Sequence, residues 1–129
     1  GRTWDEVEPL RFDDGGELFS PASYSVLVRH STGRLYWIAN VVPIHPEGNS
    51  PRYPLCVAEI DEEDVAVKRK TLFNVDARTE GESKALQLSN FGLYEDRETN
   101  EIVLTYPRLF ARNDQDWTAP CVLCRVSVE

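Results

Sequence analysis

The 129-residue sequence lacks the features of several large classes of protein. No apolar run approaches the roughly 18 residues that a membrane-spanning helix needs, and no segment resembles the apolar region of a secretory signal. No stretch of about ten residues keeps a 3.6-residue apolar period between helix caps. There is also no HExxH, no Gly-rich phosphate loop and no Ser/His/Asp set. The sequence therefore predicts a helix-poor globular chain without a recognisable catalytic motif.

Basic residues are scarce as well. The chain has 14 Lys and Arg against 22 Asp and Glu, which gives a formal charge of -8. Phosphate recognition depends on clustered Lys and Arg. We therefore expect neither a nucleic acid nor an anionic membrane as a partner.

Only three cysteines are present, Cys56, Cys121 and Cys124. An odd count without a recognisable secretory signal argues against a disulfide framework and favours a cytoplasmic location. Cys121 and Cys124 form a CxxC within PCVLCRVSV, which has the composition of a strand. Residues three apart on a strand point to opposite faces, so these thiols should not share a metal. We expect no metal site and no cofactor.

Segments rich in β-branched and aromatic residues predict about eight strands separated by polar turns. Residues 35–42 form a nearly continuous apolar run, which indicates burial on both faces. Pro9 suits an edge strand or a strand start. The predicted strands are 4–12, 24–30, 35–42, 55–61, 65–73, 86–96, 101–106 and 121–128.

The second half of the chain repeats the plan of the first at an offset of about 66 residues. Residues 32–36 align with 99–103, and residues 57–61 align with 123–127. The single domain thus divides into two units, 5–61 and 65–129, each with an outer strand followed by three inner ones. Repeats of four antiparallel strands are typical of propeller blades. We expect an all-β fold of two four-stranded blade-like repeats.

The long connections occupy the same places in both units, at 13–23, 43–54, 74–85 and 107–119. Because connections in a four-stranded meander alternate between its two ends, all four should emerge on one face. Long loops on one face of a rigid scaffold usually form a binding surface.

The segment LQLSNFGLYEDRETNEIVLTY, together with the preceding LCVAEIDEEDVAVKRKTLF and the last strand, resembles the C-terminal blades of sialidase-like (BNR-type) six-bladed propellers. The similarity covers about residues 35–128 and rests on Ser89–Phe91 and strand spacing. The segment HSTGRLYW departs from the family's Asp box, since Thr32 stands where Asp is expected. The resemblance implies a six-bladed ring, which two blades do not close. Three copies, a longer chain, or a self-sufficient two-sheet sandwich would each resolve this, and no catalytic residue of the family is carried over.

Candidate ligand contacts lie in the loops. Trp117 stands beside Asp116 and near Arg108, and an aromatic plate with charged neighbours suits a sugar; packing and surface ion pairs are the alternative. His45 and Arg52 lie in the first long loop, and Asn90 begins the innermost strand. The charges in 76–82 (Asp76, Arg78, Glu80 and Glu82) are expected to be solvated.

The leading hypothesis is a carbohydrate-binding module of propeller type that forms a ring of identical subunits, with a trimer as the candidate size, without demonstrable catalysis. A sialidase-like glycosidase is the first alternative, and it would need two carboxylates about 5 to 9.5 Å apart. The second is a structural or assembly protein with no small-molecule ligand. Whether the chain is an enzyme is left open by the sequence.

Overall fold

The computed structural model describes residues 2–128. No α-helix occurs in these residues, which confirms the predicted all-β class, and so no described helix has the length and apolar character to cross a membrane. The elements are β1 (Val26–Arg29), β2 (Leu35–Asn40), β3 (Leu55–Asp61), β4 (Ala66–Val67), the 3-10 turn η1 (Arg69–Thr71), β5 (Phe73–Asp76), β6 (Gly92–Glu95), β7 (Ile102–Pro107) and β8 (Cys121–Val126).

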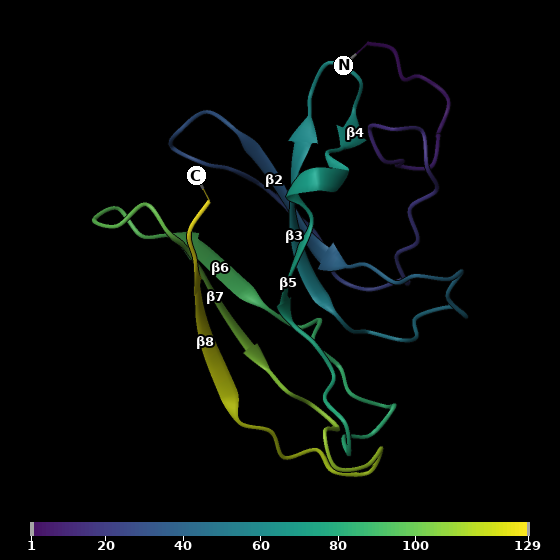
Figure 1. Ribbon diagram of the computed structural model, residues 1–129, viewed down its shortest axis with the longest axis vertical. Helices are drawn as coiled ribbons and strands as arrows, with labels where there is room; N and C mark the ends of the chain where they lie inside the picture. The colour runs from purple at the N-terminus through teal and green to yellow at the C-terminus, as the bar shows by residue number, and fades with distance from the viewer. Residues whose placement is uncertain (1, 129) are drawn as a thin grey trace.

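The strands form two antiparallel sheets (Figure 1). The first has the order β1-β2-β3, and the outer edge of β3 is shared by β4 at one end and β5 at the other. The second has the order β6-β7-β8, with six paired residues between β7 and β8. Tight turns join β1 to β2 and β6 to β7, where Gly33 (φ 87°) and Asn100 (φ 57°) take the left-handed conformation that such turns require.

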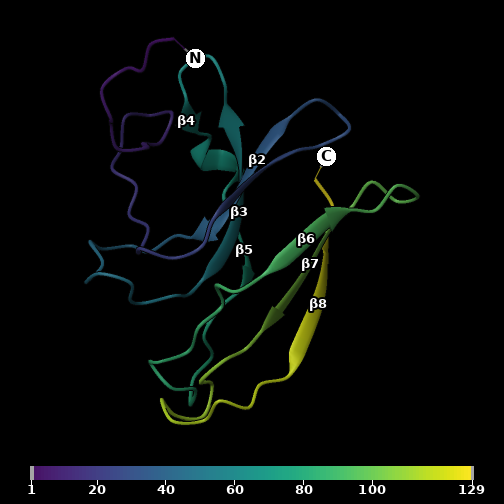
Figure 2. The same ribbon diagram turned by 180° about the vertical axis from the view of Figure 1, so that it is seen from behind.

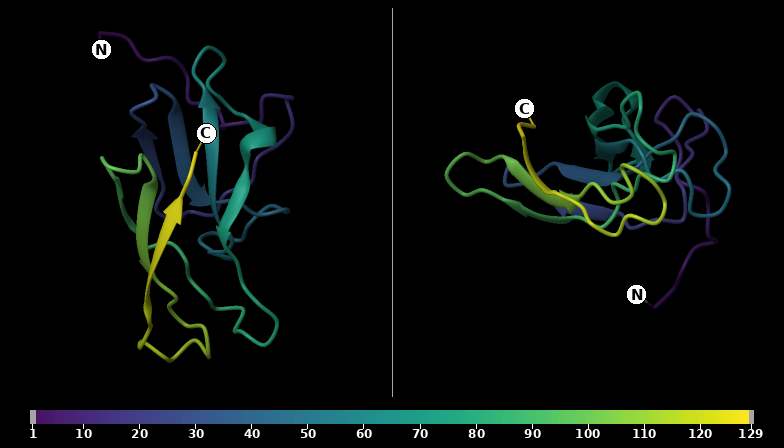
Figure 3. Two further views of the ribbon diagram at one scale, coloured as in Figure 1. Left: turned by 60° about the vertical axis from the view of Figure 1, so that its left-hand side comes forward. Right: turned by 90° about the horizontal axis from the view of Figure 1, so that it is seen from below.

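The two sheets lie face to face (Figure 3). Their alternating apolar residues form the main core between them. Tyr36 and Ile38 of β2 meet Ile102 and Leu104 of β7 in this cluster. Each fully buried Ile or Leu contributes about 2 kcal/mol relative to exposure. This layer therefore holds the two sheets together.

The opposite face of the first sheet is covered by residues 10–19. Phe12, Leu10 and Leu18 pack on Trp37 and Ala39 of β2 in a second cluster. The five residues after Leu35 in β2 are consequently all buried, which confirms the predicted burial of this segment on both faces.

The strands are divided five and three between the sheets, rather than the expected four and four. The predicted outer strand 65–73 is split by η1 into β4 and the start of β5, and both pair with β3 (Figure 2). The reason is local: the turn after Asp61 is so short that the chain folds directly back, pairing Asp61 with Ala66. In the predicted strand 4–12 only Arg11 and Phe12 make bridges, because Pro9 lacks the N–H that a ladder needs.

Candidate functional site

Three of the four long loops meet at one end of the molecule, and the first, 13–23, begins at the other end and reaches them only with its last residues. The Ala22 N–H donates to Gly48 O at 2.9 Å, and the Ser83 N–H donates to Ala111 O at 2.9 Å. Residues 87–88 connect these two pairs of loops, through Gln87 N–H to Leu109 O (2.9 Å) and Leu88 N–H to Arg52 O (2.9 Å). Residues 19–23, 43–54, 74–88 and 107–119 therefore form one hydrogen-bonded surface, the loop platform.

Asn40 fixes the centre of this platform. The side chain is fully buried at the end of β2. Its Nδ2 donates to Arg52 O and Pro54 O at 3.1 Å and to Leu88 O at 3.4 Å, and its Oδ1 accepts from Ser23 Oγ at 2.9 Å. One amide thereby joins segments of three connections, and no local sequence pattern marks it.

Arg108 is the centre of a second, charged network. Its Nη2 donates to both carboxylate oxygens of Glu82, at 2.6 and 2.7 Å, and its Nη1 donates to Asp76 Oδ1. The Tyr106 hydroxyl donates to Asp76 Oδ2 at 2.9 Å. The side chains of Arg108, Asp76 and Glu82 are only 17–20% exposed, so the expectation that Asp76 and Glu82 are solvated was wrong.

These contacts shift the pKa values of Glu82, Tyr106 and Arg108. Hydrogen bonds from the Arg108 guanidinium, and then from the Thr79 amide, lower the pKa of Glu82 to about 2. Burial, with the neighbouring Asp76, raises the pKa of Tyr106. The network ties β5, β7 and the 77–85 loop together.

A small hollow of about 260 Å³ opens beside this network. Asp116 accepts hydrogen bonds from the Thr118 hydroxyl and, at 3.0 Å, from the Thr118 amide, and these bonds lower its pKa. The Arg112 Nε lies 3.8 Å from Asp116 Oδ2. The hollow is lined by Arg108, Ala111, Arg112, Asp116, Thr118, Ala119 and Pro120.

Trp117 projects next to this hollow without lining it. The side chain is 76% exposed, and its ring stands edge-on to that of the buried Phe110, with 4.8 Å between ring centroids and 77° between planes. Phe110 thereby holds an exposed indole in place between Asp116 and Thr118.

A larger groove of about 700 Å³ lies against the 42–54 loop. Its walls include four prolines together with Ile44 and Tyr53, and Lys84 lines it from the neighbouring loop. His45 lines the groove; its Nδ1 lies 3.0 Å from Pro46 O, and its ring is 5.7 Å from that of Phe19. This groove is more apolar than the hollow at Arg108.

The six predicted contacts are thus distributed over the platform rather than gathered in one pocket. Arg108 and Asp116 line the small hollow and His45 lines the large groove. Arg52 donates to Gln87 Oε1 at 3.2 Å and to Asn49 O at 3.0 Å, which positions the loops. Asn90 is exposed, and Trp117 lies beside the small hollow.

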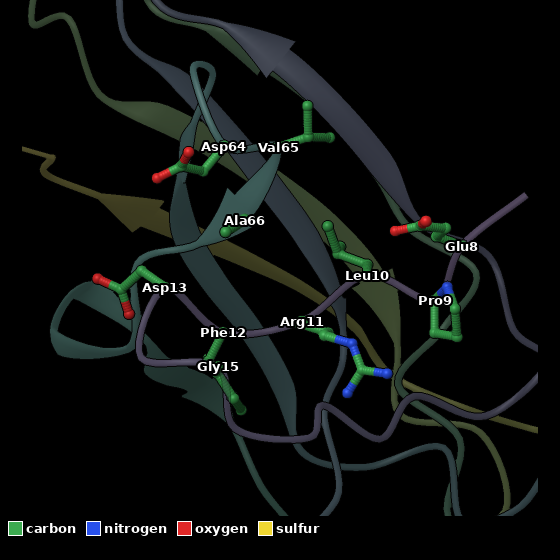
Figure 4. Close-up of a pocket in the computed structure, with 10 residues that line it drawn as sticks. All are labelled: Glu8, Pro9, Leu10, Arg11, Phe12, Asp13, Gly15, Asp64, Val65 and Ala66. Carbon is green, nitrogen blue, oxygen red and sulfur yellow. The ribbon is translucent and has the colours of Figure 1, made fainter. Parts of the chain in front are cut away.

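A separate hollow of about 380 Å³ lies at the other end of the first sheet, between residues 8–15 and the turn at 64–66. Figure 4 shows the carboxylates of Asp13 and Asp64 on one side of it and that of Glu8 on the other. Among residues 2–128, no three His, Cys, Asp or Glu side chains gather in a way that could hold a metal ion. The three thiols are free, and burial raises the pKa of Cys56 to about 11.

Comparison with known proteins does not add to this description. No family model, no curated protein and no solved structure matches the chain.

Proposed function

We propose that the chain is a carbohydrate-binding module of β-propeller type that binds its ligand at the loop platform. Trp117 carries the proposal, because a largely exposed indole in contact with Phe110 offers a flat apolar surface next to polar side chains. The apolar face of a sugar ring packs on such a surface, and its hydroxyls bond to charged neighbours.

The small hollow supplies the polar half of this site. Asp116 and Thr118 flank the indole in sequence, and Arg112 has a largely exposed guanidinium nearby. A guanidinium has five N–H donors, and three of those of Arg108 are used on Asp76 and Glu82. In this proposal the two that remain face the ligand, so Arg108 both holds the loop and contributes to binding.

Binding of the intact protein to a glycan array, followed by calorimetry with any sugar found, tests this proposal. Trp117→Ala is expected to weaken binding at least tenfold, because stacked aromatic contacts contribute on the order of 1 kcal/mol or more beyond buried area. Phe73→Ala is the control, since Phe73 is 40% exposed on β5 and lines neither the small hollow nor the large groove. Equal affinity of the two variants, or no glycan bound at all, would refute the proposal.

The glycosidase alternative receives less support from the carboxylates. Glycoside hydrolysis uses two carboxyl groups of which one has a raised pKa. The carboxyl groups whose pKa is shifted are all shifted downward; they are Asp14, Glu62, Glu82, Glu95, Asp96 and Asp116. Turnover of a chromogenic sialoside, lost in Asp116→Asn, would favour hydrolysis over binding.

We also propose that the two sheets are blade-like units and that copies of the chain assemble into a ring. Each sheet is an antiparallel meander, and the two stack face to face like neighbouring blades. The free face of the second sheet exposes Tyr94 (53%) and Leu123 (59%), which supports contact with a further subunit. The mass in solution tests this, and a monomer at all concentrations would favour a self-sufficient sandwich.

A further inference from the structure

The second sheet ends in an open edge at β8. All six residues of this strand pair with β7, and no other described strand pairs with its far side. In the first sheet the corresponding position beyond β3 is filled by β4 and β5. Figure 3 shows β8, in yellow, along the outside of the molecule.

The backbone groups that point away from β7 follow from the hydrogen-bond alternation. The Arg108 N–H donates to Pro120 O at 3.3 Å, which makes 108 and 120 a hydrogen-bonded pair. In an antiparallel ladder such pairs alternate with non-bonded ones. Val122, Cys124 and Val126 therefore bond to β7, and Cys121, Leu123 and Arg125 direct their N–H and C=O groups outward.

Of the devices that usually block strand addition, this edge has only one charged residue, Arg125. Residues 121–126 contain no Pro, Gly or Lys, and the register with β7 continues without a bulge. The edge strands β1, β5 and β6 have four residues each. A long, regular and largely apolar edge favours pairing with another strand.

We infer that residues 2–8 of a second copy of the chain add to the free edge of β8 as a further strand; this inference rests on the proposed assembly. The segment carries the two most exposed large apolar side chains, Trp4 at 92% and Val7 at 100%. It makes no strand pairing in the described structure. Arg125, the charged residue of β8, already pairs with Asp96 at 2.8 Å and with Glu101 at 3.0 Å. The unpaired backbone of residues 2–8 and their two apolar side chains, rather than charge, therefore suit this edge.

The chain's own residues 2–8 are too short to reach this edge. Leu10 and Phe12 anchor the segment on the face of the first sheet opposite to the second sheet, and Figures 1 and 2 place the segment and β8 on opposite sides. Pairing along β8 uses about six residues, and the two or three that remain span about 7 to 10 Å. Stacked sheets are already about 10 Å apart, so the partner strand comes from another subunit.

Light scattering of the intact chain over a range of concentrations tests the inference with a matched pair at one position. Leu123→Pro removes an outward N–H without removing a bond to β7, and Leu123→Thr removes the same apolar side chain but keeps the N–H. We expect Leu123→Pro to weaken association at least about tenfold, since a lost hydrogen bond and the misfit of the ring act together. Leu123→Thr loses only the exposed side chain and should weaken association clearly less than Leu123→Pro. A chain that lacks residues 2–8 should behave like Leu123→Pro.

Light scattering and amide exchange together distinguish the possible outcomes. Association that is unchanged in Leu123→Pro and in the shortened chain overturns this inference and leaves the proposed ring to another surface. A monomer at all concentrations, with fast amide exchange at Leu123 and Arg125, removes the proposed ring as well. A monomer in which these two amides are protected assigns the edge to the chain's own segment and overturns the role of a second copy. Glycan binding is measured separately, because neither variant touches the loop platform.

Discussion

Replacement of Asn40 tests whether its side-chain hydrogen bonds hold the loops of the platform together. The amide makes three donor contacts and one acceptor contact, to Arg52 O, Pro54 O, Leu88 O and Ser23 Oγ. A net hydrogen bond contributes about 1 kcal/mol, and a buried polar group left without a partner costs about 1–3 kcal/mol. Asn40→Ala should therefore lower the free energy of unfolding by about 3 kcal/mol. In a domain of this size the corresponding fall in Tm is about 10 °C.

Asn40→Asp is a more specific test, because the side chain keeps its shape and only the Nδ2 donor is replaced by an oxygen. The carboxylate would face three carbonyl oxygens without a hydrogen to donate, at a cost above that of Asn40→Ala at pH 7. Burial and the neighbouring carbonyls favour its protonated form, so its folded pKa is raised above the unfolded value of about 3.9. The deficit in stability relative to the wild type is then smallest near pH 4 and grows as pH rises through the folded pKa.

Urea unfolding of the wild type and both variants, measured from pH 4 to pH 8, checks this reasoning. Leu88 N–H exchange should also accelerate in both variants, because the platform loses its centre. A cost below about 1 kcal/mol for Asn40→Ala, or an Asn40→Asp deficit that does not change with pH, would show that the amide is not the donor that joins the loops.

The remaining predictions concern the charged network and one strained turn. The folded pKa of Glu82 is lowered from 4.5 to about 2, so its contribution to stability is complete above pH 4.5 and is lost as pH falls toward 2. Glu82→Gln should therefore reduce the dependence of the free energy of unfolding on pH in that window. Glu80→Gln, at an exposed neighbouring position, should leave this dependence unchanged. Val65 is a β-branched residue at φ 51° with its side chain in solvent, so Val65→Gly should raise the free energy of unfolding by about 1 kcal/mol. Asn100→Gly, at φ 57°, should change stability less, because Asn tolerates this conformation; equal effects on thermal melting would contradict the strain at Val65.

A buried histidine shows what the local patterns missed. His30 is 3% exposed, its Nε2 lies 2.7 Å from Asn100 O, and its Nδ1 lies 3.2 Å from Thr32 N. The bond to Asn100 connects the turns of the two hairpins, which are 70 residues apart. A lone His in a turn gives no sign of such a partner, and neither did the acidic residues that surround Arg108.

The sequence by itself determined most of the strands, where the tight turns fall, and that β2 is buried on both faces. These properties follow from alternation and turn chemistry, which act between residues close in the chain. The tertiary structure decided which strands β4 and β5 would join, and that Arg108 would meet Asp76 and Glu82. Such choices depend on chain closure and on packing summed over both sheets, and no short segment carries that information.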